Sequence, residues 1–163
     1  MKKNNLLLLA ITLLSCFFLS CSSDKEEDTI VGRWRINYAE LKEVKTNDEQ
    51  ANVAIKRYFE EYKTTLATVE YQFFKDGVYD VNGQKGAYVV DGDSLRLTPN
   101  LNLSSGVESI TVASGFKVDK KYLVLENDMT NLCRDIIHDI NGIQNPEVIE
   151  VEKVVFRMVF SRQ

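Results

Sequence analysis

The only histidine is the first residue to test for chemistry, because an imidazole acts as a base or a metal ligand near neutral pH. His138 lies close in the sequence to Asp135 and Asp139. Zinc sites draw three or four ligands at characteristic spacings, and one imidazole beside two carboxylates does not supply such a set. We therefore interpret these three residues as the solvated face of a helix, and we expect no bound metal and no other cofactor.

Acidic residues also gather near a glycine-rich stretch, where a calcium loop would need oxygen ligands at fixed positions. Asp76, Asp80 and Asn82 lack the spacing and the terminal glutamate of an EF-hand loop. The chain has no second histidine to activate a nucleophile, no phosphate loop and no Gly-x-Ser-x-Gly motif. We expect a protein that is not an enzyme. A hydrolase whose paired carboxylates meet only in the folded chain ranks last among the alternatives.

The N-terminal segment has the pattern of an export signal. Two lysines near the start precede an apolar run, Leu6 to Leu14, and small residues beside cysteines follow. That order is typical of a signal peptide. A helix that spans a membrane needs about 20 mostly apolar residues, and the acidic run that follows ends the apolar stretch too early. We expect residues 1–20 to be removed, residues 21–29 to form an acidic flexible tether, and residues 30–163 to form one folded domain.

The end of this segment carries a more specific signal. Leu19-Ser20-Cys21 resembles the lipobox of bacterial lipoproteins, in which the cysteine becomes the new N-terminus and is acylated. The resemblance implies that Cys21 carries acyl chains such as palmitate and holds the protein at the bilayer of the outer membrane. Cys16 fits almost as well, but its use would leave the apolar residues 17–19 in the tether. We therefore favour Cys21.

The tether itself resembles a second signal. Its Ser/Asp/Glu-rich run after the cysteine is similar to the surface-export signal of lipoproteins in the Bacteroides group, which implies exposure on the cell surface. The triplets Asp28-Thr29-Ile30 and Asp93-Ser94-Leu95 match the short O-glycosylation pattern of that group, so a glycan at either is a hypothesis. The plain physical interpretation, a charged segment that cannot bury enough surface to fold, is compatible with both.

The net charge limits the possible binding partners, and the number of cysteines limits the possible disulfides. Without the two lysines of the signal peptide, the 20 basic residues become 18 against 24 acidic ones, a net charge of −6. This charge argues against nucleic acid as a partner. With Cys16 removed and Cys21 acylated, Cys133 remains as the only thiol, so we expect no internal disulfide. Cys133 falls on the apolar stripe of a predicted helix, where a free cysteine behaves as a small core residue.

Alternation of apolar and polar residues predicts strands across most of the domain. Glycine-containing turns separate most of them, so consecutive strands pair as hairpins in a meander. The sequence predicts a mainly β fold, an antiparallel barrel or strongly curved sheet of about eight strands with two helices. The expected strands are residues 30–39, 69–73, 78–81, 88–90, 95–97, 107–118 and 122–126, and a long last strand after Pro146.

Two segments have helical periodicity instead. The first begins at a capping box of Thr46 and Glu49, and its apolar residues recur at helical spacing up to Leu66. The second runs from Met129 to Ile140, with Asn127 or Asp128 as its cap and Gly142 as its end. The apolar face of the first helix comprises Ala51, Ala54, Ile55, Tyr58, Phe59, Tyr62 and Leu66.

Aromatic residues give the strongest indication of a binding site. Beneath a helical lid at residues 47–66 they would line a cavity for a small apolar or amphipathic ligand. The alternative is that they fill the barrel. The domain would then be a surface module for a partner protein or glycan, marked by an exposed aromatic patch. The candidate ligand-binding residues are Tyr58, Phe59, Tyr62, Tyr71, Phe73, Tyr79 and Phe116.

Residues at the two ends of the domain suggest a family. Gly32-Arg33-Trp34 on the first strand, the meander, and a last strand that ends at Arg162 resemble the lipocalin-like, calycin-type domains of Bacteroides-group lipoproteins. The resemblance implies that Gly32, Trp34 and Arg162 form a structural motif in which the arginine covers the tryptophan. Arg162 has the strand parity of Phe156, whereas Arg157 has the opposite parity. The family resemblance further implies a barrel that binds an apolar ligand without converting it. The helix after the first strand is similar to that of fatty-acid-binding proteins, so the barrel type stays open.

Overall fold

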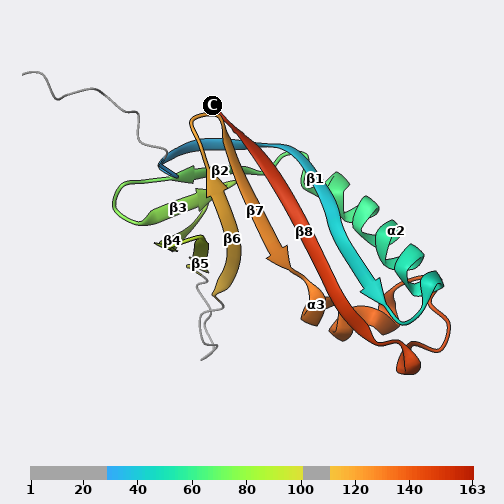
Figure 1. The fold of residues 1–163 in the computed structure, drawn as a ribbon. Coiled ribbons are helices and arrows are strands. Elements are labelled where there is room, and N and C mark those ends of the chain that lie inside the picture. The colour runs from blue at the N-terminus through green and yellow to red at the C-terminus, as the bar shows by residue number, and fades with distance from the viewer. Residues whose placement is uncertain (1–28, 101–110) are drawn as a thin grey trace, which may run out of the picture.

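Eight antiparallel strands close into a barrel in the computed structural model of this protein, which describes residues 29–100 and 111–163. The strands follow one another around the barrel in chain order, and β1 pairs with β8 to close it (Figure 1). The predicted mainly β meander is therefore confirmed, and it is closed. The strands are β1 (Gly32–Thr46), β2 (Glu70–Phe73), β3 (Val78–Val81), β4 (Gln84–Asp91), β5 (Ser94–Pro99), β6 (Val112–Val118), β7 (Tyr122–Asp128) and β8 (Val151–Arg162). The predicted start of the sixth strand, residues 107–110, lies outside the described residues.

The turn between β3 and β4 shows why the meander forms. Asn82 and Gly83 have φ angles of 49° and 88°. Two left-handed residues in a row make the two-residue turn whose twist matches that of the flanking strands. The Asp80 carboxylate accepts a hydrogen bond from the Gly83 N–H (2.7 Å), and the Asn82 side chain accepts one from the Glu70 N–H (3.0 Å). Local sequence therefore fixes this hairpin and ties it to β2.

Strands β1 and β8 are the longest and continue side by side past the rest of the barrel (Figure 1). The prediction that the first strand ends at residue 39 is wrong, because β1 pairs with β8 as far as Thr46 and Val151. Three register shifts along this pair interrupt the alternation of apolar and polar residues. Such irregularities bend and twist a strand. They explain why the pattern was lost in the sequence.

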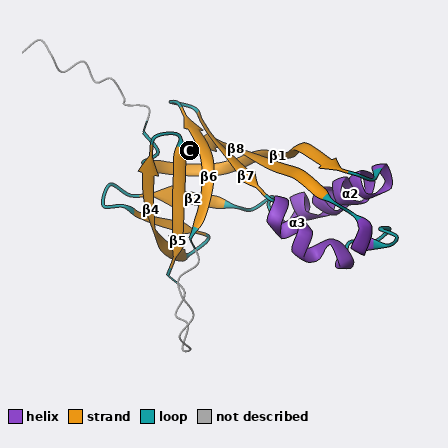
Figure 2. Ribbon diagram, turned by 60° about the horizontal axis from the view of Figure 1, so that its bottom comes forward, coloured by secondary structure: helices purple, strands orange, loops and turns teal. Residues whose placement is uncertain are grey.

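Two helices pack on this extension, at the end of the molecule away from β4 and β5 (Figure 2). They are α2 (Glu49–Thr65) and α3 (Thr130–Ile136), and the short turns η1 (Ile137–Asp139) and η2 (Pro146–Val148) follow α3. The second predicted helix is therefore shorter than expected, since its last residues form η1. None of the helices in the described ranges is long and apolar enough to cross a membrane.

The helix starts differ from the sequence prediction. A capping box of Thr46 and Glu49 is wrong, because Thr46 still belongs to β1. Asp48 is the N-cap instead, and its carboxylate accepts a hydrogen bond from the Ala51 N–H (2.8 Å). The N-cap of α3 is Met129, which makes no side-chain cap hydrogen bond, so the prediction of Asn127 or Asp128 as the cap is wrong. The Asp128 carboxylate nevertheless accepts a hydrogen bond from the Thr130 N–H (3.0 Å) and so satisfies one free amide of the first turn.

The buried residues form two cores that meet at Val69 and Met158. The barrel core lies inside the strands, and the helical core lies between the helices and the β1–β8 extension. Cys133 is buried in the helical core, and burial raises the pKa of its thiol to about 11. The largest side chains of the barrel core, each no more than 1% exposed, are Trp34, Phe73, Leu95, Leu123, Leu125 and Phe160; those of the helical core are Ile55, Phe59, Val154 and Phe156.

Candidate ligand site at the barrel mouth

Three of the predicted site residues come from α2 and pack on the helical core. Phe59 is buried, and its ring centroid lies 5.3 Å from that of Phe156. The Tyr62 ring lies 5.8 Å from the same phenylalanine, and Tyr58 meets Phe59 edge to face at 5.6 Å. Both tyrosines remain partly exposed. These rings therefore join the helix to the inner face of β8.

Three other predicted site residues, Tyr71, Phe73 and Tyr79, lie inside the barrel. Tyr71 stacks on Phe73 with centroids 5.5 Å apart, and Tyr79 lies 6.2 Å from each of them. Burial, with smaller effects from Tyr79 and Tyr62, raises the pKa of the Tyr71 hydroxyl to about 12. Each of these six aromatic residues contacts at least one other of the six.

Phe116 packs at the edge of the barrel core and lines a pocket of about 510 Å³. Tyr88 and Val90 of β4 and Phe116 and Val118 of β6 supply two of its walls. Each pair lies two positions apart on its strand, so both side chains of a pair point to one face of the sheet. The third wall is the segment before β1, residues 29–31. We call this space the mouth pocket.

The third wall is fixed by residues from both ends of the domain. The Trp34 indole donates a hydrogen bond to the Ile30 carbonyl oxygen (2.6 Å). Arg162 donates from Nη1 to the Val31 carbonyl (3.1 Å) and from Nη2 to the Thr29 carbonyl (2.7 Å). Its guanidinium carbon lies over the Trp34 ring, 4.3 Å from the centroid. The side chain of Ile30 is thereby buried against the barrel core.

Gly32 is needed at the point where this wall joins β1. Its φ is +139°, a conformation that side-chain-bearing residues rarely adopt. A Cβ atom there would also lie 3.1 Å from Arg162 Nη1. The absence of a side chain therefore lets the guanidinium approach the backbone closely. Gly32, Trp34 and Arg162 act together to position residues 29–31.

The chemistry of the mouth pocket is apolar. None of the seven described residues that line it carries a charge. The Tyr88 hydroxyl donates a hydrogen bond to the Phe74 carbonyl oxygen (2.7 Å), so its polar group already has a partner. Burial and the nearby Asp76 carboxylate raise the pKa of Tyr88. The arrangement offers apolar contact area and no acid, base or nucleophile.

Sequence reasoning missed most of this site. Tyr88, Val90 and Val118 were predicted only as parts of strands, and Ile30 as the start of the first strand and part of a possible glycosylation triplet. Phe116 alone was named for ligand binding. The parity of Phe116 and Val118 was visible, but alternation does not tell which strands lie opposite one another. His138 lies in η1, and no cluster of three or more His, Cys, Asp or Glu residues arranged to hold a metal occurs in residues 29–100 and 111–163.

Comparisons with known proteins identify no relative, so the inference about function rests on the fold and the site. No family model, curated protein or solved structure matches the chain. The architecture is nevertheless specific: a closed, all-antiparallel meander of eight strands with an arginine from the last strand over a tryptophan of the first. This β-barrel is consistent with a lipocalin-like fold and compatible with ligand binding.

Proposed function

We propose that this protein is a lipid-anchored binding protein of the bacterial outer membrane that holds a small apolar or amphipathic ligand without converting it. The observation that carries the proposal is the mouth pocket, which has apolar walls and lies at the open end of a β-barrel. Ligand pockets in proteins typically have volumes of about 300–1,000 Å³ and often lie in the mouths of barrels. The mouth pocket, at about 510 Å³, falls within this range.

Burial of alkyl groups supplies the binding energy. An alkyl chain gains about 0.8 kcal/mol for each methylene group that it removes from water. Ile30, Val90, Phe116 and Val118 supply the apolar surface against which such a chain packs. Because the pocket is open to solvent on one side, a polar end group on the ligand would stay in water. This favours an amphipathic ligand over a fully apolar one.

The proposed anchor lies close to this pocket along the chain. Thr29, which lines the pocket, follows Cys21 by eight residues. Eight residues span at most about 28 Å. Acylation of Cys21 would therefore keep the pocket within reach of the bilayer surface, where amphipathic molecules collect. The acidic run in the tether supports exposure on the cell surface as part of the same proposal.

Native mass spectrometry tests the proposal on the intact lipoprotein purified from its own cell envelope. The informative variant is Val90→Lys, which places a charge in the apolar pocket at a residue that is already 43% exposed. Val89→Lys is the matched control, because the neighbouring valine is exposed and does not line the pocket. We expect wild type and Val89→Lys to carry an extractable lipid that Val90→Lys lacks. An empty wild-type protein, or equal loading of all three, would contradict the proposal.

A further inference from the structure

A second hollow runs over the outside of the barrel. Two adjoining depressions of about 540 Å³ and 270 Å³ share Lys117, Val124 and Glu126, so they form one elongated, open groove. It crosses β1, β8, β7 and β6. The side chains of Val124 and Glu126 point outward, since Leu123 and Leu125, which alternate with them, are buried in the barrel core. We call it the outer groove.

Two exposed tyrosines, Tyr38 and Tyr122, lie beside an apolar surface in this groove. Tyr38, Val159 and Val124 lie directly opposite one another on β1, β8 and β7. Val159 is only 6% exposed although it faces outward, because its neighbours on both sides cover it. Tyr38 and Tyr122 are 49% and 44% exposed, so much of each ring is open to solvent. The groove therefore presents two aromatic rings beside a valine floor.

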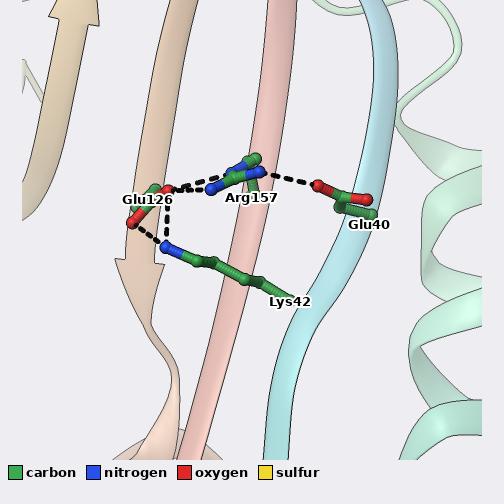
Figure 3. Close-up of polar contacts among 4 residues, drawn as sticks. All are labelled: Glu40, Lys42, Glu126 and Arg157. Atoms are coloured by element: carbon green, nitrogen blue, oxygen red, sulfur yellow. Dashed lines mark hydrogen bonds and ion pairs between the residues drawn. The ribbon is translucent and has the colours of Figure 1, made fainter.

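The polar part of the groove contains an ion-pair network (Figure 3). Glu126 accepts hydrogen bonds from Arg157 Nη2 (2.6 Å) and from Lys42 Nζ (2.9 Å), and Arg157 Nη1 donates to Glu40 (3.1 Å). Lys42 reaches across β8 to make its contact (Figure 3). Lys42 and Arg157 lower the pKa of Glu126, and Glu126 in turn raises the pKa of Arg157. These contacts bring the charged side chains together before any ligand arrives, which reduces the entropy cost of binding.

Charges of both signs are interspersed along the groove. Asp119 accepts hydrogen bonds from the N–H groups of Lys121 and Tyr122, both at 2.7 Å, and these lower its pKa. Lys117 lies between this carboxylate and Glu126 in the lining. A groove of mixed sign offers no uniform potential for a polyanion or a polycation. Its ligand must therefore be close to neutral.

The topology also argues against an extended peptide. Peptides that bind β-sheets in an extended form usually add a strand at a free edge. Most of the groove lies on the faces of β7 and β8, which are paired on both sides over this region: β7 with β6 and β8, and β8 with β7 and β1. Strand β1 pairs with β2 only from Gly32 to Arg35, but at Tyr38 its edge toward the groove is paired with β8. The backbone hydrogen bonds that such a peptide needs are therefore already used. Recognition in the groove has to come from side chains.

We infer that the outer groove binds a neutral saccharide chain. A sugar ring has an apolar C–H face that packs on an exposed aromatic ring, and hydroxyl groups at its edge that pair with fixed carboxylate, guanidinium and amide groups. Tyr38 and Tyr122 supply the rings, and Glu126, Arg157 and Asn37 supply the polar partners. Because the groove is elongated and open, a polymer passes through it with its ends in solvent.

Gly115 provides a way to block the groove without disturbing the fold. It lines the groove on β6, and a Cβ atom placed there would lie 3.7 Å from the Glu126 carbonyl oxygen, an ordinary contact distance. Valine suits a strand better than glycine does. Gly115→Val should therefore fold with unchanged or higher thermal stability while its side chain occupies the groove.

Affinity electrophoresis of the intact lipoprotein in a polyoxyethylene detergent tests the inference. The probes are native gels that contain soluble starch, mannan, arabinoxylan or mixed-linkage β-glucan. We expect at least one polymer to retard the wild-type protein, and the apparent affinity to fall at least tenfold in Gly115→Val and in the double variant Tyr38→Ala/Tyr122→Ala. Leu132→Ala removes an exposed apolar residue of α3 outside the groove and should migrate like wild type.

Two results would overturn the inference. If none of the four polymers retards the wild-type protein, the groove does not serve this class of ligand, which is also the outcome expected for a groove that docks a protein. If a polymer retards the wild type and both groove variants equally, saccharide binds elsewhere on the molecule. Neither result affects the mouth pocket, which shares only Phe116 with the lining of the groove.

Discussion

Arg162, the penultimate residue of the chain, lies over the ring of Trp34 on the first strand and hydrogen-bonds the backbone on either side of Ile30. The contact joins the last strand to the first and fixes the segment that leads into the domain. An arginine is required for both tasks, because its planar fork stacks on a ring and donates two parallel hydrogen bonds. The same pair therefore stabilises the barrel and shapes one wall of the mouth pocket.

Trp34→Ala should destabilise the domain by about 3–5 kcal/mol, as expected when a large buried aromatic side chain is truncated. The indole is fully buried, and its loss also frees the Ile30 carbonyl and the Arg162 guanidinium. Denaturant unfolding followed by circular dichroism measures the change. A loss of less than about 1 kcal/mol would show that the tryptophan is not essential to the barrel core.

Two glycines of the barrel, Gly86 on β4 and Gly115 on β6, should differ in their tolerance of alanine. A Cβ atom at Gly86 would lie 2.5 Å from both the Thr98 carbonyl oxygen and the Tyr79 ring, so backbone would have to move. We expect Gly86→Ala to cost about 2–3 kcal/mol through overpacking. Gly115→Ala, with its nearest neighbour at 3.7 Å, is the control and should change stability by less than about 0.5 kcal/mol. Equal thermal shifts for the two variants would be inconsistent with this packing.

We predict that the folded domain loses stability in strong alkali because of a tyrosine in the barrel core. The pKa of Tyr71 is raised to about 12 in the folded protein, whereas a tyrosine in an unfolded chain titrates near 10. The folded protein thus holds this proton more tightly, and the resulting stability is complete below pH 10 and is lost as the pH rises toward 12. The loss from this residue is about 2–3 kcal/mol. Unfolding free energies of wild type and Tyr71→Phe between pH 9 and 12 should diverge, and parallel curves would refute the assignment.

We predict that Cys21, and not Cys16, carries the lipid anchor. Cells grown with radiolabelled palmitate should label the wild-type protein and Cys16→Ala, because Cys16 is removed with the signal peptide in our interpretation. Cys21→Ala should incorporate no label and should remain uncleaved. Label that follows Cys16 instead would move the processing site and lengthen the tether to the mouth pocket.

Most of the fold was predictable because short sequence patterns determine its strands and turns. Alternation marks the strands, and pairs such as Asn82-Gly83 fix the hairpins through their left-handed backbone. The prediction failed at the end of β1, where two of the three register shifts broke the alternation beyond residue 39, and the misplaced capping box at Thr46 was a consequence of that failure. Irregularities that depend on pairing with a distant strand leave no local signal.

The binding surfaces were less predictable because they depend on tertiary neighbours. The mouth pocket joins residues 29–31 to β4 and β6, and its position depends on Arg162 from the other end of the domain. The outer groove was missed for a related reason. Tyr38 and Tyr122 are 84 positions apart in the sequence, and only the closure of β1 onto β8 brings them to the same face.

Fluorescence quenching of Trp34 by a brominated fatty acid tests the ligand-binding function most directly. Trp34 is the only tryptophan, it is shielded from water, and its indole hydrogen-bonds a residue that lines the mouth pocket. We predict saturable quenching in the wild-type lipoprotein and in Val89→Lys, which the unbrominated fatty acid does not cause and the Val90→Lys variant does not show. Unchanged fluorescence in the wild type, or equal quenching in Val90→Lys, would contradict a ligand in the mouth pocket.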